Sequence, residues 1–220
     1  MGAFDWTVII KNMPFFMSGL LTTFELAVVA ISGGLFFGML VGMARLSHIK
    51  LIYYPATIFV NFFRSLPLLL VIFWFYFLVP IIAGRPLGDF VSASVAFVVF
   101  EAAYFAEIVR AGIQSISKGQ VQAAYSTGFN YAQTMRHIIL PQAMRNMVPS
   151  LITQTVVVFQ DTSLAYVIGL KEFLRSASIV DAREMKSVEI YAFIGLVYFI
   201  FCFLMSRYAK KLEAKRGAAK

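Results

Sequence analysis

The chain has 220 residues, of which 60% are hydrophobic and 14% are charged, and its formal net charge is +8. A soluble domain is about 45–50% apolar and about 25% charged, so this composition, with its apolar residues gathered in long stretches, excludes a soluble protein and predicts an integral membrane protein. The positive charge is typical of a basic tail on a membrane face rather than of a nucleic-acid-binding surface, because six of the nineteen Lys and Arg residues follow the last apolar stretch: Arg207, Lys210, Lys211, Lys215, Arg216 and Lys220.

Five apolar stretches are predicted to span the membrane as helices, at residues 20–44, 56–83, 90–112, 147–170 and 190–207. The first contains Gly38 and Gly42, a small-xxx-small pair that lets two helices approach closely. The second contains Pro67, which interrupts its helical hydrogen bonds. No repeat or low-complexity linker divides the stretches, and no cleavable signal peptide precedes them. The sequence therefore predicts an all-α integral membrane protein, with residues 1–220 forming one domain.

The distribution of basic residues predicts the orientation of these spans, since cytoplasmic loops carry more Lys and Arg. One side has twelve: Arg45, Lys50, Arg110, Lys118, Arg136, Arg145 and the six tail residues. The other side has six: Lys11, Arg85, Lys171, Arg175, Arg183 and Lys186. The N-terminus is therefore expected outside the membrane, and the C-terminus and residues 118–141 are expected in the cytoplasm.

Residues 118–141 are polar, although the segments on both sides are apolar. A short helix is predicted at residues 120–127, with Gly128 as its left-handed terminator and Asn130 as the N-cap of a second helix. Leu140-Pro141 is expected to end that second helix, because proline disfavours helical geometry in the preceding residue. Two helices joined at a glycine corner form either a plain connecting loop or a protrusion that fits a cleft on a soluble partner.

Arg64, at the edge of the second span, is a candidate ligand for a substrate carboxylate, with Ser65 beside it. Two other readings remain open. The Arg64 side chain can extend to lipid headgroups, or it can pair with Asp161 in the fourth span.

Asp161 stands in a run of four polar residues that cannot all face lipid. It is a candidate partner for a substrate ammonium, with Gln160, Thr162 and Ser163 supplying hydrogen bonds. The alternative is a helix break that only shapes the membrane path.

The third span contains two carboxylates. Glu107 and Arg110 are three residues apart and can pair on one helix face, which favours a structural or gating pair over substrate contact. Glu101 either faces the interior of a dimer or bonds locally to Tyr104 and nearby serines.

The polar segment resembles the EAA loop of ABC importer permeases. Gln122-Ala123-Ala124 is followed after three residues by Gly128 and after nine more by Ile138-Ile139-Leu140-Pro141, with Gln in place of the first Glu. A literal EAA at residues 101–103 lacks the downstream Gly and Leu-Pro.

The stretches FFRSLPLLL, YFAEIVRAGIQSISKGQ and FQDTSL are similar to polar amino-acid uptake permeases, above all those of the glutamate/aspartate type. Relatives for basic substrates more often have Lys at the position of Gln160, which favours an acidic substrate.

The resemblance implies a type I importer permease whose cytoplasmic loop docks on an ATPase. The residues it assigns to this coupling are Gln120, Gln122, Ala123, Ala124, Gly128, Leu140 and Pro141. It also implies a second permease subunit (a paralogue or a copy), two ATP-binding subunits and an external solute-binding protein. ATP and Mg would bind to the ATPase partner, because this sequence lacks a Gly-x-x-x-x-Gly-Lys-Ser/Thr phosphate loop. The chain itself is expected to be neither an enzyme nor a holder of metal or cofactor.

Two other classes of function fit the sequence less well. A carrier driven by an ion gradient would need inverted repeats or a fuller set of spans, and neither is visible. A membrane enzyme would need a metal site or a nucleophile with its base, and the sequence suggests none. Within the importer class, basic or other polar amino acids remain alternative substrates.

Overall fold

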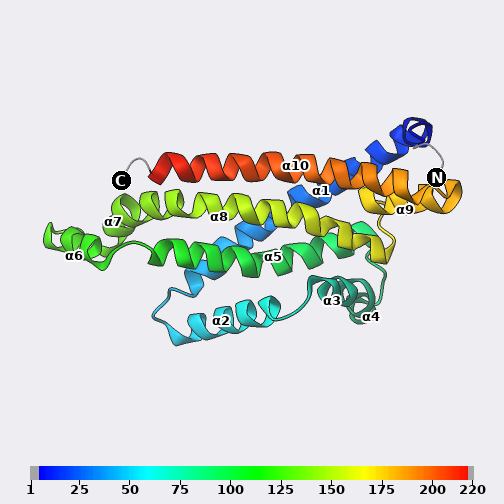
Figure 1. Ribbon diagram of the computed structural model, residues 1–220. Coiled ribbons are helices and arrows are strands. Elements are labelled where there is room, and N and C mark those ends of the chain that lie inside the picture. Colours follow the sequence, from blue (N-terminus) through cyan, green and yellow to red (C-terminus); the bar gives the residue numbers. More distant parts are fainter. Residues whose placement is uncertain (1–4, 218–220) are drawn as a thin grey trace.

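The computed structural model describes the backbone of residues 5–217 and the side chains of residues 5–211. Every regular element in this part of the chain is a helix (Figure 1), which confirms the predicted fold class. Part of the predicted basic tail lies outside the described residues, namely the side chains of Lys215 and Arg216 and the whole of Lys220.

Among the described residues, four helical segments are long and apolar enough to cross a membrane. They are α1 (Thr7–Ala44), α5 (Asp89–Gln114), the segment Tyr131–Ile168 that contains α8 (Leu140–Asp161), and α10 (Ser187–Gly217). The shorter helices are α2 (Lys50–Arg64), α3 (Leu68–Phe73), α4 (Val79–Ala83), α6 (Lys118–Ser126), α7 (Tyr131–Thr134) and α9 (Phe173–Glu184). With α2 to α4 counted as one broken span, the total is five, in agreement with the predicted number.

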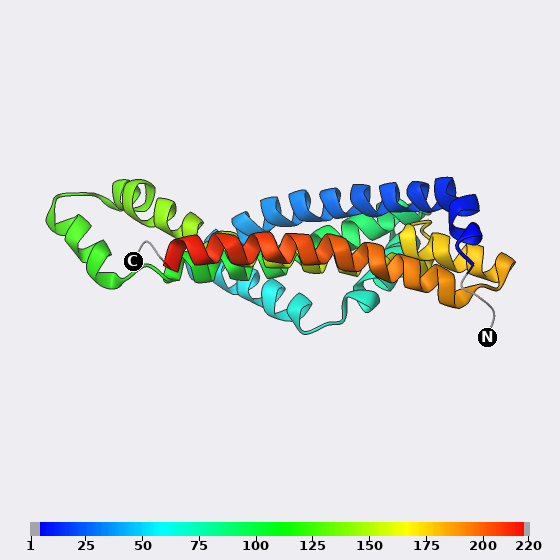
Figure 2. The ribbon, with the colours of Figure 1, turned by 45° about the horizontal axis from the view of Figure 1, so that its top comes forward.

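The long helices form a bundle with two distinct ends. In Figure 1, α5 lies between α8 and α2, α10 lies beside α8, and α1 crosses behind α5 and α8. Figures 1 and 2 place α6, α7 and the C-terminal part of α10 at one end, and α9 and the N-terminal part of α1 at the other. We call these the α6–α7 end and the α9 end. The main apolar core lies between α1, α3, α5 and the end of α8, around Leu26, Ile72, Phe97 and Val158.

Glycines on α1 allow it to pack tightly against α5. Gly34, Gly38 and Gly42 are all buried. A Cβ atom on Gly38 would lie 2.6 Å from the Cβ of Phe105, and one on Gly42 would lie 2.8 Å from the carbonyl oxygen of Ala106. These distances leave no room for a methyl group, so the predicted small-xxx-small contact is confirmed and its partner is α5.

The second span is broken rather than continuous. Helix α2 and the segment Leu68–Ala83 are bent by 105° relative to each other. Pro67 has extended backbone angles, φ −70° and ψ 136°, directly before α3. Because proline has no N–H to donate, the helical ladder stops there, and the single span expected at residues 56–83 becomes two helices that meet at a corner.

The polar segment has the predicted glycine corner between two helices. Gly128 has a φ of +85°, and Asn130 caps α7 in a capping box with Gln133. However, Leu140-Pro141 does not end the second helix, so that expectation was wrong. A π-helical turn at Met135–Ile139 leads directly into α8. The wider turn accommodates the proline, and the Gln142 side chain donates a hydrogen bond of 2.9 Å to the Ile138 carbonyl.

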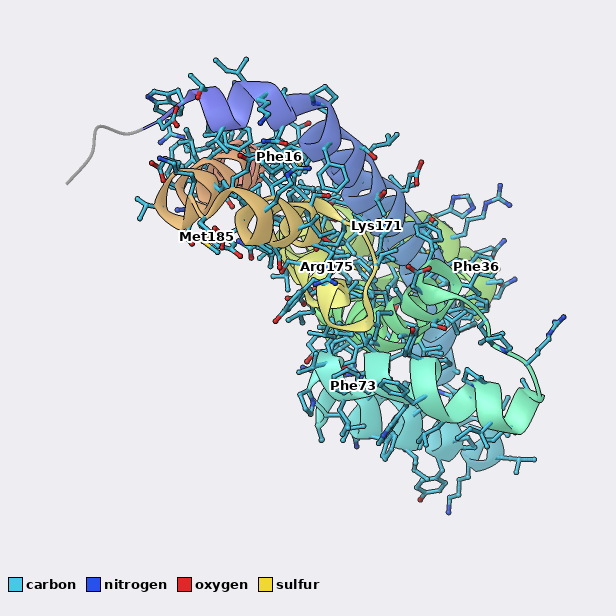
Figure 3. All side chains as sticks on the ribbon, turned by 90° about the vertical axis from the view of Figure 1, so that its right-hand side faces the viewer. Phe16, Phe36, Phe73, Lys171, Arg175 and Met185 are labelled. Atoms are coloured by element: carbon cyan, nitrogen blue, oxygen red, sulfur yellow. The ribbon has the colours of Figure 1, made fainter. Side chains whose placement is uncertain are left out.

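Ion pairs and hydrogen bonds join α1, α9 and α10 at the α9 end, which Figure 3 shows from outside. Lys11 pairs with Glu184 at 3.5 Å, and Lys186 pairs with Asp5 at 3.7 Å. Arg183 donates a hydrogen bond to the buried side chain of Asn12. Helix α9 is therefore fixed to the ends of two long helices.

Candidate functional site

A stripe of polar side chains runs along one face of α8. Asn146, Ser150, Thr153 and Gln160 are exposed, and their spacing of three, four or seven residues places them on the same side of the helix. In a membrane, polar groups of this kind face a water-filled path or another protein rather than lipid. The first three of these residues were not predicted from the sequence, although their helical spacing is a signal that could have identified them.

Glu101 lies next to this stripe, on α5, and its side chain is fully buried. Its Oε2 accepts a hydrogen bond of 2.8 Å from Nε2 of Gln154 on α8, whereas its Oε1 has no hydrogen-bond partner. The carboxyl also lies within electrostatic range of Asp161. The local bonds expected to Tyr104 and nearby serines are not formed, because the burial of Glu101 between α5 and α8 brings Gln154 to it instead.

Asp161 ends α8 at the point where the helix tightens into a 3-10 helix, Thr162–Ile168. The Thr162 hydroxyl donates to the Phe159 carbonyl at 2.6 Å, and the Ser163 hydroxyl donates to the Gln160 carbonyl at 2.8 Å. Both hydroxyls are therefore used within the turn. Asp161 is partly exposed, whereas the Gln160 side chain also interacts with Cys202 of α10. We call Glu101, Gln154 and Asp161 the anionic pole.

Three arginines converge on the carboxylate of Glu107. Arg45 follows α1, Arg64 ends α2, and Arg110 lies one turn after Glu107 on α5. Arg45 and Arg110 make direct ion pairs with Glu107, and Arg64 approaches it with an Nη1–Oε2 distance of 3.7 Å. We call these four residues the cationic pole. The sequence suggested the pair of Glu107 and Arg110, but it gave no local signal for the other two partners.

Arg64 meets Glu107 rather than Asp161 in this structure. Its guanidinium also lies over the ring of Tyr104, with the central carbon 5.4 Å from the ring centroid. Ser65 is exposed, and its hydroxyl donates to the Asn61 carbonyl at 2.7 Å. The proposed pair of Arg64 and Asp161 is not formed, because the 105° corner after α2 holds Arg64 beside α5.

The two poles are offset along α5. Glu101 and Glu107 are six residues apart, which corresponds to about 9 Å at the helical rise of 1.5 Å per residue. Glu101 is fully buried, so the partly exposed Asp161 is the carboxylate of the anionic pole that can meet an ammonium, and the exposed Arg64 of the cationic pole can meet a carboxylate.

The protrusion at the α6–α7 end carries the predicted coupling residues. Most of them are exposed: Gln120, Gln122, Ala123, Gly128, Leu140 and Pro141. Ala124 is the coupling residue that is buried, on α6. Gln120, Ala123, Phe129 and Ile138 line a surface groove between α6 and the start of the long helical segment, which gives the protrusion a shaped surface for a protein partner.

The described side chains contain no group of three His, Cys, Asp or Glu residues that could hold a metal ion. Both poles are instead made of Arg, Asp, Glu and Gln side chains, whose chemistry is ion pairing and hydrogen bonding.

Comparison with known proteins shows the family and the fold of this chain. Residues 34–217 match the family described as binding-protein-dependent transport system inner membrane component. The chain is 44% identical to the glutamate/aspartate import permease protein GltK of Escherichia coli O6:H1, over 96% of this chain and 99% of that protein. It is 35% identical to the probable glutamine ABC transporter permease protein GlnP of Bacillus subtilis (strain 168), over 94% of this chain and 95% of that protein. The crystal structure of an amino acid ABC transporter with histidines superposes with a TM-score of 0.91 at 31% identity, over 98% of this chain and all of that one. The chain therefore belongs to the family of inner membrane components of binding-protein-dependent transport systems, the multi-pass permease subunits of ABC importers.

Proposed function

We propose that this chain forms part of the membrane path through which an ABC importer takes up glutamate and aspartate. The observation that carries the proposal is the cationic pole, where three arginines share one carboxylate and leave an excess of positive charge. This charge attracts a substrate that bears two carboxylates. The likeness to a permease named for glutamate and aspartate supports the same substrates.

Within the path, the substrate lies between the two poles. Arg64, with Ser65 beside it, takes a carboxylate, because a guanidinium can bind a carboxylate through two parallel hydrogen bonds. Asp161 takes the ammonium, with Gln160 beside it. Thr162 and Ser163 contribute by holding the 3-10 turn that aims Asp161.

The importer requires partners that bring the energy and complete the path. A second permease subunit, a paralogue or a copy, covers the polar face of α8, because one chain leaves that face open. Two ATP-binding subunits dock on the α6–α7 protrusion and bind ATP and Mg. An external solute-binding protein delivers the amino acid at the α9 end.

Movement of the protrusion is transmitted to the substrate site by one continuous helical segment. Helix α7, the π-helical turn and α8 follow one another without a break from Tyr131 to Asp161. When the ATP-binding subunits close and shift the protrusion, α8 moves with it and carries Asp161. The N-terminus faces outward and the C-terminus faces the cytoplasm, as the twelve-to-six distribution of basic residues favours.

Uptake of labelled glutamate, aspartate, histidine and arginine, by cells with and without this subunit, tests the substrate assignment. We expect glutamate and aspartate uptake to require the subunit and to stop with vanadate, an inhibitor of ABC ATPases. Uptake of arginine or histidine instead would overturn the acidic assignment and leave the importer class intact. Uptake that continues with vanadate would favour a carrier driven by an ion gradient.

A further inference from the structure

The three arginines around Glu107 are held to very different degrees. The Arg45 side chain is 11% exposed and Arg110 is 27% exposed, and both donate hydrogen bonds to the Glu107 carboxylate. Arg110 also donates to Gln114. Arg64 is 40% exposed, and its single contact with Glu107 is longer, at 3.7 Å, and is made to the same oxygen that Arg45 holds; its guanidinium otherwise lies over the ring of Tyr104. Arg64 is therefore the partner that Glu107 releases most easily.

The position of Arg64 allows it to exchange one carboxylate for another. It ends α2 directly before the corner of the broken span, so its backbone is not confined within a continuous helix. Glu107 lines a surface pocket between α5 and α8, together with Ser115 at the end of α5 and with Asn146 and Ser150 of the polar stripe on α8. Arg64 is not itself a lining residue of the pocket, but its contact with Glu107 brings the guanidinium to this carboxylate, where an entering ligand carboxylate would meet it.

We propose that Glu107 and the carboxylate of the substrate compete for Arg64, and that this competition releases the substrate. The inference rests on the proposed function, since it requires an amino acid in this path. The four residues of the cationic pole sum to a charge of +2, and a bound carboxylate lowers the sum to +1. When Arg64 turns to the substrate, Arg45 and Arg110 still neutralise Glu107. When Arg64 returns to Glu107, the substrate loses its partner and leaves.

Glu107 is thus a positioning residue that acts through Arg64, and its removal has an unusual expected effect. Replacing Glu107 by Gln removes the competitor and leaves Arg64 to the substrate. Exposed ion pairs contribute modestly, so we expect the Kd for glutamate to fall by about two- to fivefold. Because release then lacks its competitor, the uptake turnover should fall as well. A purely structural role would weaken binding or leave it unchanged.

The test measures binding and turnover separately. The Kd for labelled L-glutamate is measured on the purified complex of permease and ATP-binding subunits without the solute-binding protein. Turnover is measured as ATP-driven uptake by the complete importer in liposomes. The variants are Glu107→Gln, Arg64→Gln and the double variant, with Arg145→Gln as the matched control. Arg145 is an exposed arginine of α8 that forms no ion pair among the described side chains.

The proposal predicts that the effect of Glu107→Gln depends on Arg64. Arg64→Gln should raise the Kd by about tenfold, and adding Glu107→Gln to it should change the Kd no further. Arg145→Gln should resemble the wild type. An unchanged or higher Kd in Glu107→Gln, or an equal change with and without Arg64, would overturn the proposal. If Glu107→Gln does not assemble, Glu107→Asp replaces it, because the shorter carboxylate draws back from Arg64, and the same fall in Kd is expected.

Failure of the inference and failure of the proposed function give different results. If the wild-type complex takes up no glutamate or aspartate, the proposed function is wrong. If the wild type takes them up but the variants show no dependence on Arg64, the exchange at Glu107 is wrong and the importer assignment stands.

Discussion

Glu172 is a fully buried carboxyl that caps the N-terminus of α9. Its two oxygens accept hydrogen bonds from the backbone N–H groups of Leu174, at 2.8 Å, and Arg175, at 2.6 Å. Thr23 of α1 accepts a hydrogen bond from the neighbouring N–H of Phe173 at 3.1 Å. Burial raises the pKa of Glu172 to about 7, because the loss of solvation outweighs the two hydrogen bonds from the backbone. The protonation state of the residue that caps α9 therefore changes with pH near neutrality.

We expect Glu172→Gln to change how the thermal stability depends on pH. The pKa of Glu172 rises from 4.5 in the unfolded chain to about 7 in the folded one, so the folded state binds the proton more tightly. The protonated Glu172 therefore contributes roughly 3 kcal/mol to the free energy of unfolding. This contribution is complete below pH 4.5 and is lost as the pH rises through about 7. The Tm of the wild type in detergent, measured from pH 4.5 to 8, should fall more steeply than that of the Gln variant. Parallel curves would contradict this assignment.

At the scale of elements, the packing of α1 on α5 brings α1 directly against the turn of α5 that carries Glu101. Three glycines one turn apart form the contact, and Gly34 would place a Cβ 2.8 Å from the Cβ of Glu101. The same helix face therefore supports the buried carboxyl of the anionic pole. A larger side chain on this face of α1 should therefore displace Glu101, although α1 contributes no side chain to the anionic pole.

We predict that Gly38→Ala destabilises the protein by about 1–3 kcal/mol, because its methyl group would overpack the contact with Phe105. Gly195→Ala on α10 is the matched control, since a Cβ there meets no atom within 4 Å. The control should be neutral or more stable by roughly 0.5–1 kcal/mol, as expected for Gly replaced by Ala within a helix. Thermal unfolding in detergent measures both variants, and equal losses would argue against a close α1–α5 contact.

At the scale of the whole molecule, the two ends differ in shape and bonding. The α6–α7 end projects as two short helices around the glycine corner. At the α9 end, an ion pair joins Lys11 of α1 to Glu184 of α9, and a second joins Lys186, just before α10, to Asp5, just before α1. A projecting end suits contact with a moving partner, and a bonded end suits the docking of a protein that delivers a ligand. The assignment of these ends to the two sides of the membrane can be tested directly.

We expect a cysteine at position 85 to react with a membrane-impermeant maleimide in cells with an intact inner membrane. A cysteine at position 48 should react only after that membrane is opened. Arg85→Cys and His48→Cys suit this test because both side chains are exposed, in loops at opposite ends of the bundle. The single native cysteine, Cys202, is buried and is first replaced by Ser to remove background. The reverse pattern of labelling would invert the proposed orientation.

Local features of the sequence predicted those parts of the structure that depend on neighbouring residues. Gly128 and Asn130 form the corner and the cap as expected, because backbone preference and side-chain capping act within a few residues. The break near Pro67 also follows from local chemistry. The continuation of the helix through Pro141 was not predicted, since it depends on a π-helical turn for which the sequence has no simple signal.

The sequence by itself determined that this is a helical membrane protein with a polar protrusion, and which charged residues lie within its spans. Long apolar stretches, caps and turns are properties of contiguous residues, so no tertiary information was needed for them. Apart from the pair of Glu107 and Arg110, which is local to α5, only the tertiary structure decided how these charges pair. Arg45 and Glu107 are separated by 62 residues, and Glu101 and Gln154 by 53. Contacts between residues so far apart in the sequence depend on how α1, α2, α5 and α8 pack. The sequence alone is compatible with many different pairings of the same charged residues.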